Sequence, residues 1–245
     1  IKGINLRTNV DNFDLIIAAG GKTLPYSAAL KLLFKKPLIQ LGSPRGMKPS
    51  LYDALITVER YFNHPSNIVA KVTPNLYSPK ICTVAAKKKG LKEHFLFLIG
   101  GEGIGYFYNK EEWDSLISSI ISMHHKTKLP ISIVTSRRSS AEVEKEFISK
   151  LSKIPLDYSV WYHKGNRDYD LAALLGSAKN IFVTEDSAMM NSESISSGKP
   201  VTTLFPRKIT YFLRYLEESG SDKQYHQAFV HAFVLKTSGA SEIAL

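Results

Sequence analysis

The chain has 245 residues, 44% of them hydrophobic, and a formal net charge of +10. This length and apolar content suit one large or two small folded domains and exclude a disordered chain. No run approaches the roughly 18 consecutive apolar residues of a membrane-spanning helix. The single cysteine, Cys82, excludes an internal disulfide and a cysteine-based zinc site, which fits a reducing compartment, so a cytoplasmic protein is expected.

The basic charge favours polyanionic surroundings, which include phosphorylated small molecules, nucleic acid and an anionic membrane surface. The densest basic runs are Lys35-Lys36 and Lys87-Lys88-Lys89. Neither run is interleaved with aromatic residues, so both are interpreted as solvated surface and nucleic acid is not an expected partner.

Short apolar runs alternate with a helical stretch in the first part of the chain. Gly20 and Gly21 follow the first run as a tight turn, and a helix beginning at Thr23 is expected to end before Pro37. Strands that alternate with helices predict a parallel sheet. The strands expected here are 13–18, 37–41, 54–58 and 68–72.

The stretch from 73 to 92 is irregular, because it combines two prolines, a lysine run and a glycine. A domain boundary is expected there, which divides the chain into an N-terminal domain, 1–85, and a C-terminal domain, 86–245. The second domain repeats the α/β alternation. Its expected strands are 94–99, 131–135, 158–161, 180–184 and one from Pro200. Its expected helices are 110–126, one opened by a Ser139–Glu142 capping box, 169–175, 188–197, and further segments at 209–218 and from 222.

Four loops follow strands of the second domain and are expected to meet at one sheet edge, where α/β proteins bind ligands. The loop after residue 99 is glycine-rich through Gly100 and Gly101, but it matches G-x-G-x-x-G in no register, so a dehydrogenase is disfavoured. Its glycines allow close approach of a phosphate or sugar, and a plain turn is the competing interpretation. The other three loops are 136–138, 164–166 and 185–187.

Arginine and hydroxyl residues in these loops suggest an anion site. Arg137 and Arg138, after Ser136, can pair with phosphate, although surface arginines often have no such role. Asp186 and Ser187 open a helix whose free N–H groups attract anions, and simple helix capping is the alternative. Glu193 lies almost two turns along that helix, where it either accepts hydrogen bonds from ribose or sugar hydroxyls or faces solvent.

Two further motifs have structural explanations. The D-x-D of Asp168-Tyr169-Asp170 is a spelling associated with metal-bound nucleotide sugars, but its place at a helix start favours capping. No G-x-S-x-G surrounds Ser187, so hydrolase chemistry is unsupported.

Several segments together resemble the family of mitochondrial fission "elongated mitochondria" proteins and their bacterial relatives. In the second half these are LFLIGG, ISIVTSRR, KGN and VTEDSAMMNSESISSGKPV, and in the first half FDLIIAAGGKT, SPRG, YDALITVE and NIVAKVTPN. The resemblance covers residues 13–205. It implies an α/β fold of two Rossmann-like domains with parallel sheets, similar to GT-B glycosyltransferases, with a nucleotide sugar held mainly by the C-terminal domain. The family has also been labelled a nucleoside-diphosphate-sugar epimerase.

The chain departs from the family pattern at two places. Relatives begin with an additional strand and loop before the position of Phe13, so the N-terminal domain is expected to be incomplete. Where relatives tend to have P-E-H-D, this chain has Val58-Glu59-Arg60-Tyr61, so a His-Asp pair is missing and catalysis is less supported than donor binding.

The leading hypothesis is a metal-independent, GT-B-like glycosyltransferase that binds a nucleotide-diphosphate sugar between its domains and needs no cofactor. The expected donor-binding residues are Gly100, Gly101, Ser136, Arg137, Arg138, Asp186, Ser187 and Glu193, and the general base is Glu59. The alternatives are an epimerase, and a non-catalytic scaffold whose basic surface docks peripherally on an anionic membrane.

Overall fold

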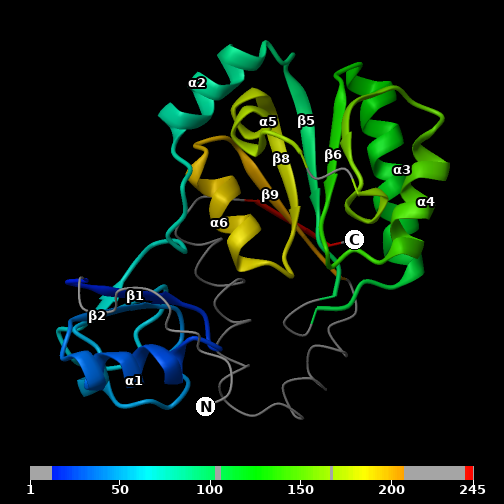
Figure 1. Cartoon of the computed structure of the whole chain (residues 1–245). Coiled ribbons are helices and arrows are strands. Elements are labelled where there is room, and N and C mark those ends of the chain that lie inside the picture. Colours follow the sequence, from blue (N-terminus) through cyan, green and yellow to red (C-terminus); the bar gives the residue numbers. More distant parts are fainter. Residues whose placement is uncertain (1–12, 103–105, 166–167, 207–240, 245) are drawn as a thin grey trace. The chain divides into compact units, whose positions relative to one another are not determined.

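A computed structural model describes residues 13–102, 106–165, 168–206 and 241–244 (Figure 1). The chain forms two compact units, Ile1–Thr73 and Pro74–Leu245, and each is described by itself. The expected segments at 209–218 and from 222 lie outside the described residues.

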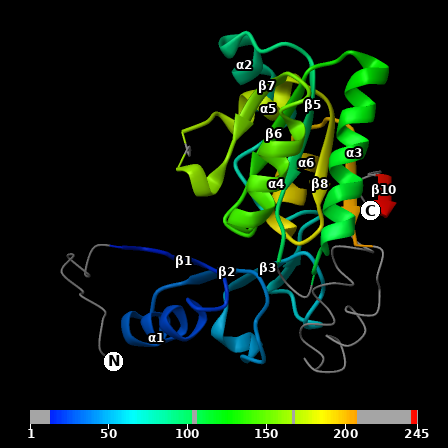
Figure 2. The same ribbon diagram turned by 90° about the vertical axis from the view of Figure 1, so that its right-hand side faces the viewer.

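The first unit contains a parallel sheet of four strands in the order β1-β2-β3-β4. The strands are β1 (Ile16–Ala19), β2 (Leu38–Leu41), β3 (Ala54–Thr57) and β4 (Asn67–Val69). Helix α1 (Leu24–Phe34) lies along one face (Figure 2), and a short 3-10 helix, η1 (Pro49–Leu51), precedes β3. Along β2 and β3 the buried side chains Leu38, Gln40, Leu55 and Thr57 alternate with more exposed ones, because alternate residues of a strand point to opposite sides. The parallel α/β organisation expected from the sequence is confirmed.

The second unit contains a six-stranded sheet in the order β10-β9-β8-β5-β6-β7, and every pair in it is parallel. The strands are β5 (His94–Ile99), β6 (Ile131–Thr135), β7 (Leu156–Val160), β8 (Ala178–Thr184), β9 (Val201–Phe205) and β10 (Ser241–Ala244). The chain runs outward from β5 to β7 and then crosses back to β8. β5 and β8 are therefore neighbours although far apart in sequence, and this reversal of strand order is where such sheets form ligand sites.

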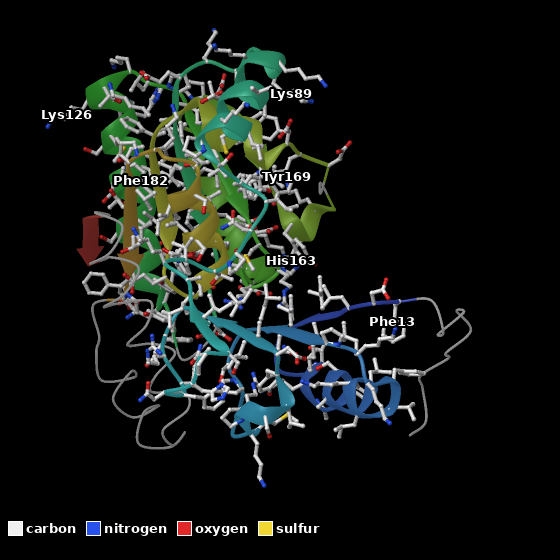
Figure 3. All side chains as sticks on the ribbon, turned by 90° about the vertical axis from the view of Figure 1, so that its left-hand side faces the viewer. Phe13, Lys89, Lys126, His163, Tyr169 and Phe182 are labelled. Atoms are coloured by element: carbon white, nitrogen blue, oxygen red, sulfur yellow. The ribbon has the colours of Figure 1, made fainter. Side chains whose placement is uncertain are left out.

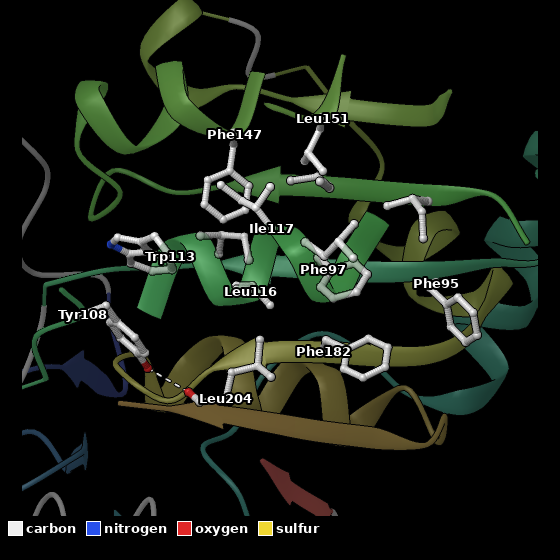
Figure 4. Packing of buried hydrophobic residues seen from close by; sticks show 14 of the residues in the cluster. Phe95, Phe97, Tyr108, Trp113, Leu116, Ile117, Phe147, Leu151, Phe182 and Leu204 are labelled. Carbon is white, nitrogen blue, oxygen red and sulfur yellow. Dashed lines mark hydrogen bonds between the residues drawn. The ribbon is translucent and has the colours of Figure 1, made fainter. Parts of the chain in front are cut away.

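Helices cover both faces of this sheet, as parallel strands require. Helices α3 (Lys110–Thr127) and α4 (Ala141–Leu151) pack on one face, and α2 (Pro79–Lys89), α5 (Leu171–Ser177) and α6 (Ala188–Ser196) on the other (Figure 1). The split follows the alternation along β5, since Phe95 and Phe97 point to the α3 side and Leu96 and Leu98 to the α5 side. Figure 4 shows the α3 side, where Phe97 stacks on Phe182 with 4.6 Å between ring centroids.

Helix α2 belongs to the second unit, so the chain divides between Thr73 and Pro74 and not after residue 85. Prolines and lysines made this segment look like a linker, but Cys82 on α2 is 1% exposed and packs in the α5-side core. Helices α2 and α5 touch closely at Gly176 of α5, where an added Cβ would overlap the carbonyl oxygen of Cys82 on α2. Ser78 caps α2 by accepting the Ile81 N–H at 3.3 Å.

Replacing Gly176 by alanine is expected to destabilise the second unit, although alanine normally favours a helix. The added methyl group would press on backbone atoms of α2, and overpacking of this kind costs about 1–3 kcal/mol. Urea unfolding would measure the loss, with the exposed Lys87→Ala on α2 as the control. An equal or higher stability of Gly176→Ala would contradict the close contact of α2 with α5.

No helix in the described part of the chain is both long and apolar enough to cross a membrane.

Candidate functional site

The carboxyl ends of β5, β6 and β7 border a pocket of about 230 Å³ in the second unit. Three of the expected site residues line it together: Ser136, Arg137 and Glu193. The remaining wall is mainly apolar and aromatic, formed by Leu98, Val134, Thr135, Val160, Tyr162, Tyr169, Leu171 and Met190. Figure 3, drawn from the α5 and α6 side, shows Tyr169 on this side of the sheet and His163 beyond the end of β7. An apolar cavity with a few convergent polar groups is the usual form of a small-molecule site.

Arg137 and Arg138 occupy different environments, although the sequence suggested one role for both. Arg137 is exposed at the pocket, and within the described ranges it has no ion-pair partner. The Arg138 guanidinium instead donates to the Asp186 backbone oxygen and lies 3.3 Å from the Asp186 carboxylate. Arg137 is therefore available to an anionic ligand, whereas Arg138 is engaged within the protein.

Asp186 lies beneath the glycine-rich loop and is 0% exposed. An added Cβ on Gly100 would overlap its carboxylate, and one on Gly101 would overlap the Arg138 carbonyl oxygen. Burial raises the pKa of Asp186, while hydrogen bonds from Thr184 and Gly101 and the Arg138 charge act in the opposite direction. The Asp186 carboxylate therefore lies inside the protein against Gly100, and its role in donor binding stays a prediction.

The glycines are needed for this packing, because only residues without a Cβ fit between Asp186 and Arg138. The Gly100 N–H donates to the Thr184 hydroxyl at 2.7 Å, and the Gly100 oxygen accepts from Ser139 at 2.6 Å. Both polar backbone groups of Gly100 are therefore bonded within the protein.

Ser187 caps helix α6, since its hydroxyl accepts the Met190 N–H at 3.4 Å, and it is 8% exposed. Capping uses one of the N–H groups at the start of the helix, and the N–H groups of the first turn have no partner within the helix. The capping interpretation is thus confirmed, and the anion interpretation stays a prediction for the backbone at this end of α6.

Ser139 does not form the expected capping box with Glu142, and that prediction is wrong. Ser140 caps α4 by accepting the Val143 N–H at 3.2 Å. Ser139 is 1% exposed and turns inward to donate to the carbonyl oxygens of Ile99 and Gly100. With two consecutive serines, the sequence pattern could not tell which one faces the helix.

Glu193 lies one to two turns along α6 with its side chain at the pocket, and burial raises its pKa. Nearby tyrosines share this environment: burial, followed by the charge of Glu193, raises the pKa of Tyr77 to about 12 and also raises that of Tyr169. A partly desolvated carboxylate gains most from a ligand that brings hydrogen-bond donors, such as sugar hydroxyls.

The raised pKa of Glu193 predicts a pH-dependent stability. Its ionised form opposes folding, so the penalty is absent below the unfolded-state pKa near 4.5 and complete above the folded-state value. Glu193→Gln is therefore expected to be more stable than the wild type at about pH 8 and to lose this advantage near pH 4.

Thermal unfolding at both pH values would measure this difference. Glu142→Gln is the control, and the opposite change in stability is expected for it at the higher pH. Hydrogen bonds from its own backbone N–H and from Ser140 lower the pKa of Glu142, so its ionised form favours folding. A Glu193→Gln protein no more stable than the wild type at the higher pH would contradict the desolvated environment of Glu193.

Glu59 belongs to the first unit, after β3, and is partly buried. Burial raises its pKa, which suits a general base, and the Thr57 hydroxyl donates to its backbone oxygen at 2.5 Å. The Asn67 side chain holds the residues that follow, because it accepts the N–H groups of Tyr61 and Phe62. Its role as a base stays a prediction.

The D-x-D motif is explained in part by capping, since Asp170 accepts the Ala173 N–H at 3.0 Å and opens α5. Asp168 is exposed and borders a second cavity of about 410 Å³ with Tyr77, Lys89 and Tyr158. Of the expected 164–166 loop, residue 166 lies outside the described residues. Among the residues that the structure describes, no three His, Cys, Asp or Glu side chains form a cluster suited to a metal ion.

Three hydroxyl-bearing residues of the pocket wall were not among the site residues expected from the sequence: Thr135, Tyr162 and Tyr169. Thr135 carried a usable signal, because it is the last residue of a strand whose exit loop was singled out. Tyr162 begins a 3-10 helix after β7, η2 (Tyr162–Lys164), Tyr169 comes after this helix, and no spacing rule connects the two tyrosines with Glu193.

Comparison with known proteins identifies the family and the fold. The profile of the mitochondrial fission ELM1 family matches residues 5–241. No curated protein sequence matches significantly. Among solved structures, the chain is similar to MurG of Acinetobacter baumannii, with a TM-score of 0.51, 14% identity and coverage of 94% of this chain and 60% of that one. It is also similar to the UDP-GlcNAc 2-epimerase of Methanocaldococcus jannaschii, with a TM-score of 0.51, 16% identity and coverage of 92% of this chain and 71% of that one.

The chain thus spans 60% of the length of MurG, and at these identities the likeness concerns the fold. The two parallel α/β units agree with that fold, which is GT-B-like as expected. The match over residues 5–241 and this architecture together place the chain in the mitochondrial fission ELM1 family.

Proposed function

We propose that the second unit binds a nucleotide-diphosphate sugar and that the protein is a GT-B-like glycosyltransferase. The observation that carries the proposal is the pocket at the ends of β5, β6 and β7, where Ser136, Arg137 and Glu193 converge. They come from the loop after β6 and from helix α6, and they bring a cation, a serine hydroxyl and a carboxylate to a largely apolar wall.

Each of these groups has a chemical role in the proposal. Arg137 and the N–H groups at the start of α6 bind the diphosphate and stabilise the negative charge that develops on the leaving group. Glu193 accepts hydrogen bonds from ribose hydroxyls, and Tyr162 and Tyr169 pack against the nucleoside. Because the positive charge comes from the protein, the transfer is proposed to need no metal ion or other cofactor.

The base that activates the acceptor is proposed to come from the first unit, with Glu59 as the candidate. Its raised pKa lets it hold a proton more readily than an exposed carboxylate does. The sequence at this place, Val58-Glu59-Arg60-Tyr61, lacks a His-Asp pair, so donor binding is the better supported half of the proposal.

A panel of nucleotide sugars and nucleoside diphosphates in a thermal-shift assay tests the proposal. A ligand at about 100 times its Kd raises the free energy of unfolding by about 2.7 kcal/mol, which is measurable as a higher melting temperature. The proposal fails if the folded protein is stabilised by no member of the panel.

A nucleotide-sugar epimerase is the second candidate, because the UDP-GlcNAc 2-epimerase matches the chain with the same TM-score as MurG. Among the residues that line the described pocket, Glu193 is the one carboxylate and there is no histidine. Product analysis separates the two enzymes, since an epimerase isomerises the sugar without an acceptor.

A third candidate is a non-catalytic scaffold that docks peripherally on an anionic membrane from the cytoplasm. The net charge of +10 and the missing His-Asp pair favour it. Salt-sensitive binding to phosphatidylserine vesicles, together with no response to nucleotides, would support the scaffold over either enzyme.

A further inference from the structure

A buried carboxylate on α4, that of Glu144, forms hydrogen bonds with residues at the ends of β6 and β7. Glu144 is 1% exposed, and its Oε1 accepts the Thr135 hydroxyl at 2.5 Å. Its Oε1 and Oε2 also accept the backbone N–H of His163, at 3.2 and 3.0 Å. The Thr135 hydroxyl in turn accepts the Tyr162 N–H at 2.9 Å. Thr135 and Tyr162 both line the pocket. Glu144 does not line it, but its hydrogen bonds fix the positions of these two residues of the pocket wall.

A second buried side chain, Ser139, connects these walls with the glycine-rich loop. Its hydroxyl donates to Gly100 at 2.6 Å and accepts the Ser136 N–H at 3.2 Å. The Ser139 backbone oxygen accepts from the His163 ring at 2.5 Å, which fixes the proton on Nε2. One hydrogen-bonded network therefore connects the loops after β5, β6 and β7.

We propose that Glu144 is a positioning residue for the candidate site. Through Thr135, Tyr162 and His163 it fixes the spacing between the β6 exit loop, which carries Ser136 and Arg137, and the segment after β7. The part of this inference that concerns ligand affinity rests on the proposed function, whereas the coupling between the loops does not.

The chemistry of the network explains why a carboxylate is used at a buried place. Burying a charge is costly unless it is hydrogen-bonded, and the two oxygens of Glu144 accept from a hydroxyl and a backbone N–H. An apolar residue of similar size would fill the space but leave the His163 N–H and the Thr135 hydroxyl without this acceptor. The alternative is a stabilising role spread evenly over the unit, and the two roles predict different patterns of local opening.

Amide hydrogen exchange on the unliganded full chain distinguishes them. Glu144→Gln removes the charge and replaces one of the two acceptor oxygens by a donor NH2 group, and exchange is expected to be at least about 10-fold faster in peptides covering 135–139 and 159–165, with α3 unchanged. Glu146→Gln on the same helix is the matched control, because its carboxylate is partly exposed and forms ion pairs with Lys110 and Lys150 at 3.7 and 4.0 Å. Unchanged exchange in both segments, or equally faster exchange throughout the second unit, overturns the proposal.

If Glu144→Gln does not fold, two milder substitutions of Thr135 test the same coupling between the loops. Thr135→Val removes the hydroxyl between Glu144 and Tyr162, and Thr135→Ser retains it, so faster exchange in the first and not the second is expected. Uridine diphosphate is then titrated into the same proteins, with affinity at least about 10-fold weaker in Glu144→Gln or Thr135→Val and restored in Thr135→Ser. If the wild type binds no nucleotide, the proposed function fails, and the exchange data still test the coupling.

Discussion

Replacing Arg138 by alanine is expected to lower the free energy of unfolding by about 3 kcal/mol, because it removes the partner of a buried carboxylate. Asp186 is fully buried, and Arg138 supplies its counter-charge at 3.3 Å and a second hydrogen bond to its backbone oxygen. Without Arg138, the Asp186 carboxylate must either stay charged and unpaired or take up a proton, and both lower the stability at neutral pH. Urea unfolding of the purified protein measures this loss.

Two further variants show whether the loss comes from the pair. Arg137→Ala is the matched control, since the neighbouring side chain is exposed and its removal should change stability by no more than about 0.5 kcal/mol. Adding Asp186→Asn to Arg138→Ala should recover part of the stability, because the buried charge is then gone. Similar stabilities of Arg137→Ala and Arg138→Ala would mean that the pair contributes little.

Replacing Arg137 by alanine is expected to weaken nucleoside diphosphate binding by about 10- to 150-fold while leaving the fold intact. Arg137 is the exposed cation of the pocket, and charge-assisted hydrogen bonds contribute about 1.5–3 kcal/mol. Arg137→Lys should retain part of the affinity, since it keeps the charge but loses the forked geometry that matches phosphate. Isothermal titration measures the affinities.

The control for this experiment is Lys126→Ala, which removes an exposed cation at the end of α3 and changes the net charge equally. If both variants weaken binding to the same extent, the effect arises from overall charge, and Arg137 does not contact the ligand.

Much of the fold followed from local patterns in the sequence. Apolar runs bounded by turn residues identified β5 and β6 with their observed ends, and the stripe through Trp113, Leu116 and Ile120 identified α3. These patterns are strong because burial on a sheet face leaves a regular period in the sequence. The boundary between the units was less predictable, because α2 is lysine-rich and its packing depends on Gly176, more than 80 residues away.

The location of the candidate site could be predicted from the sequence, but the role of each residue in it could not. Parallel strands bring their exit loops to one edge, so Ser136, Arg137 and Glu193 could be grouped from the sequence alone. Which of two adjacent arginines faces the pocket depends on a partner, Asp186, that is 48 residues distant. The same limit applies to Ser139 and Ser140, and to Glu144, whose contacts with Thr135 and His163 leave no periodic signal.

A crystal structure of the protein soaked with the nucleoside diphosphate that stabilises it most would test the proposed site most directly. We predict electron density in the pocket between β6, β7 and α6, with the diphosphate against Arg137 and the start of α6 and the ribose within hydrogen-bond distance of Glu193. A nucleotide bound elsewhere on the second unit, or bound here without contact to Arg137 and Glu193, would contradict the account.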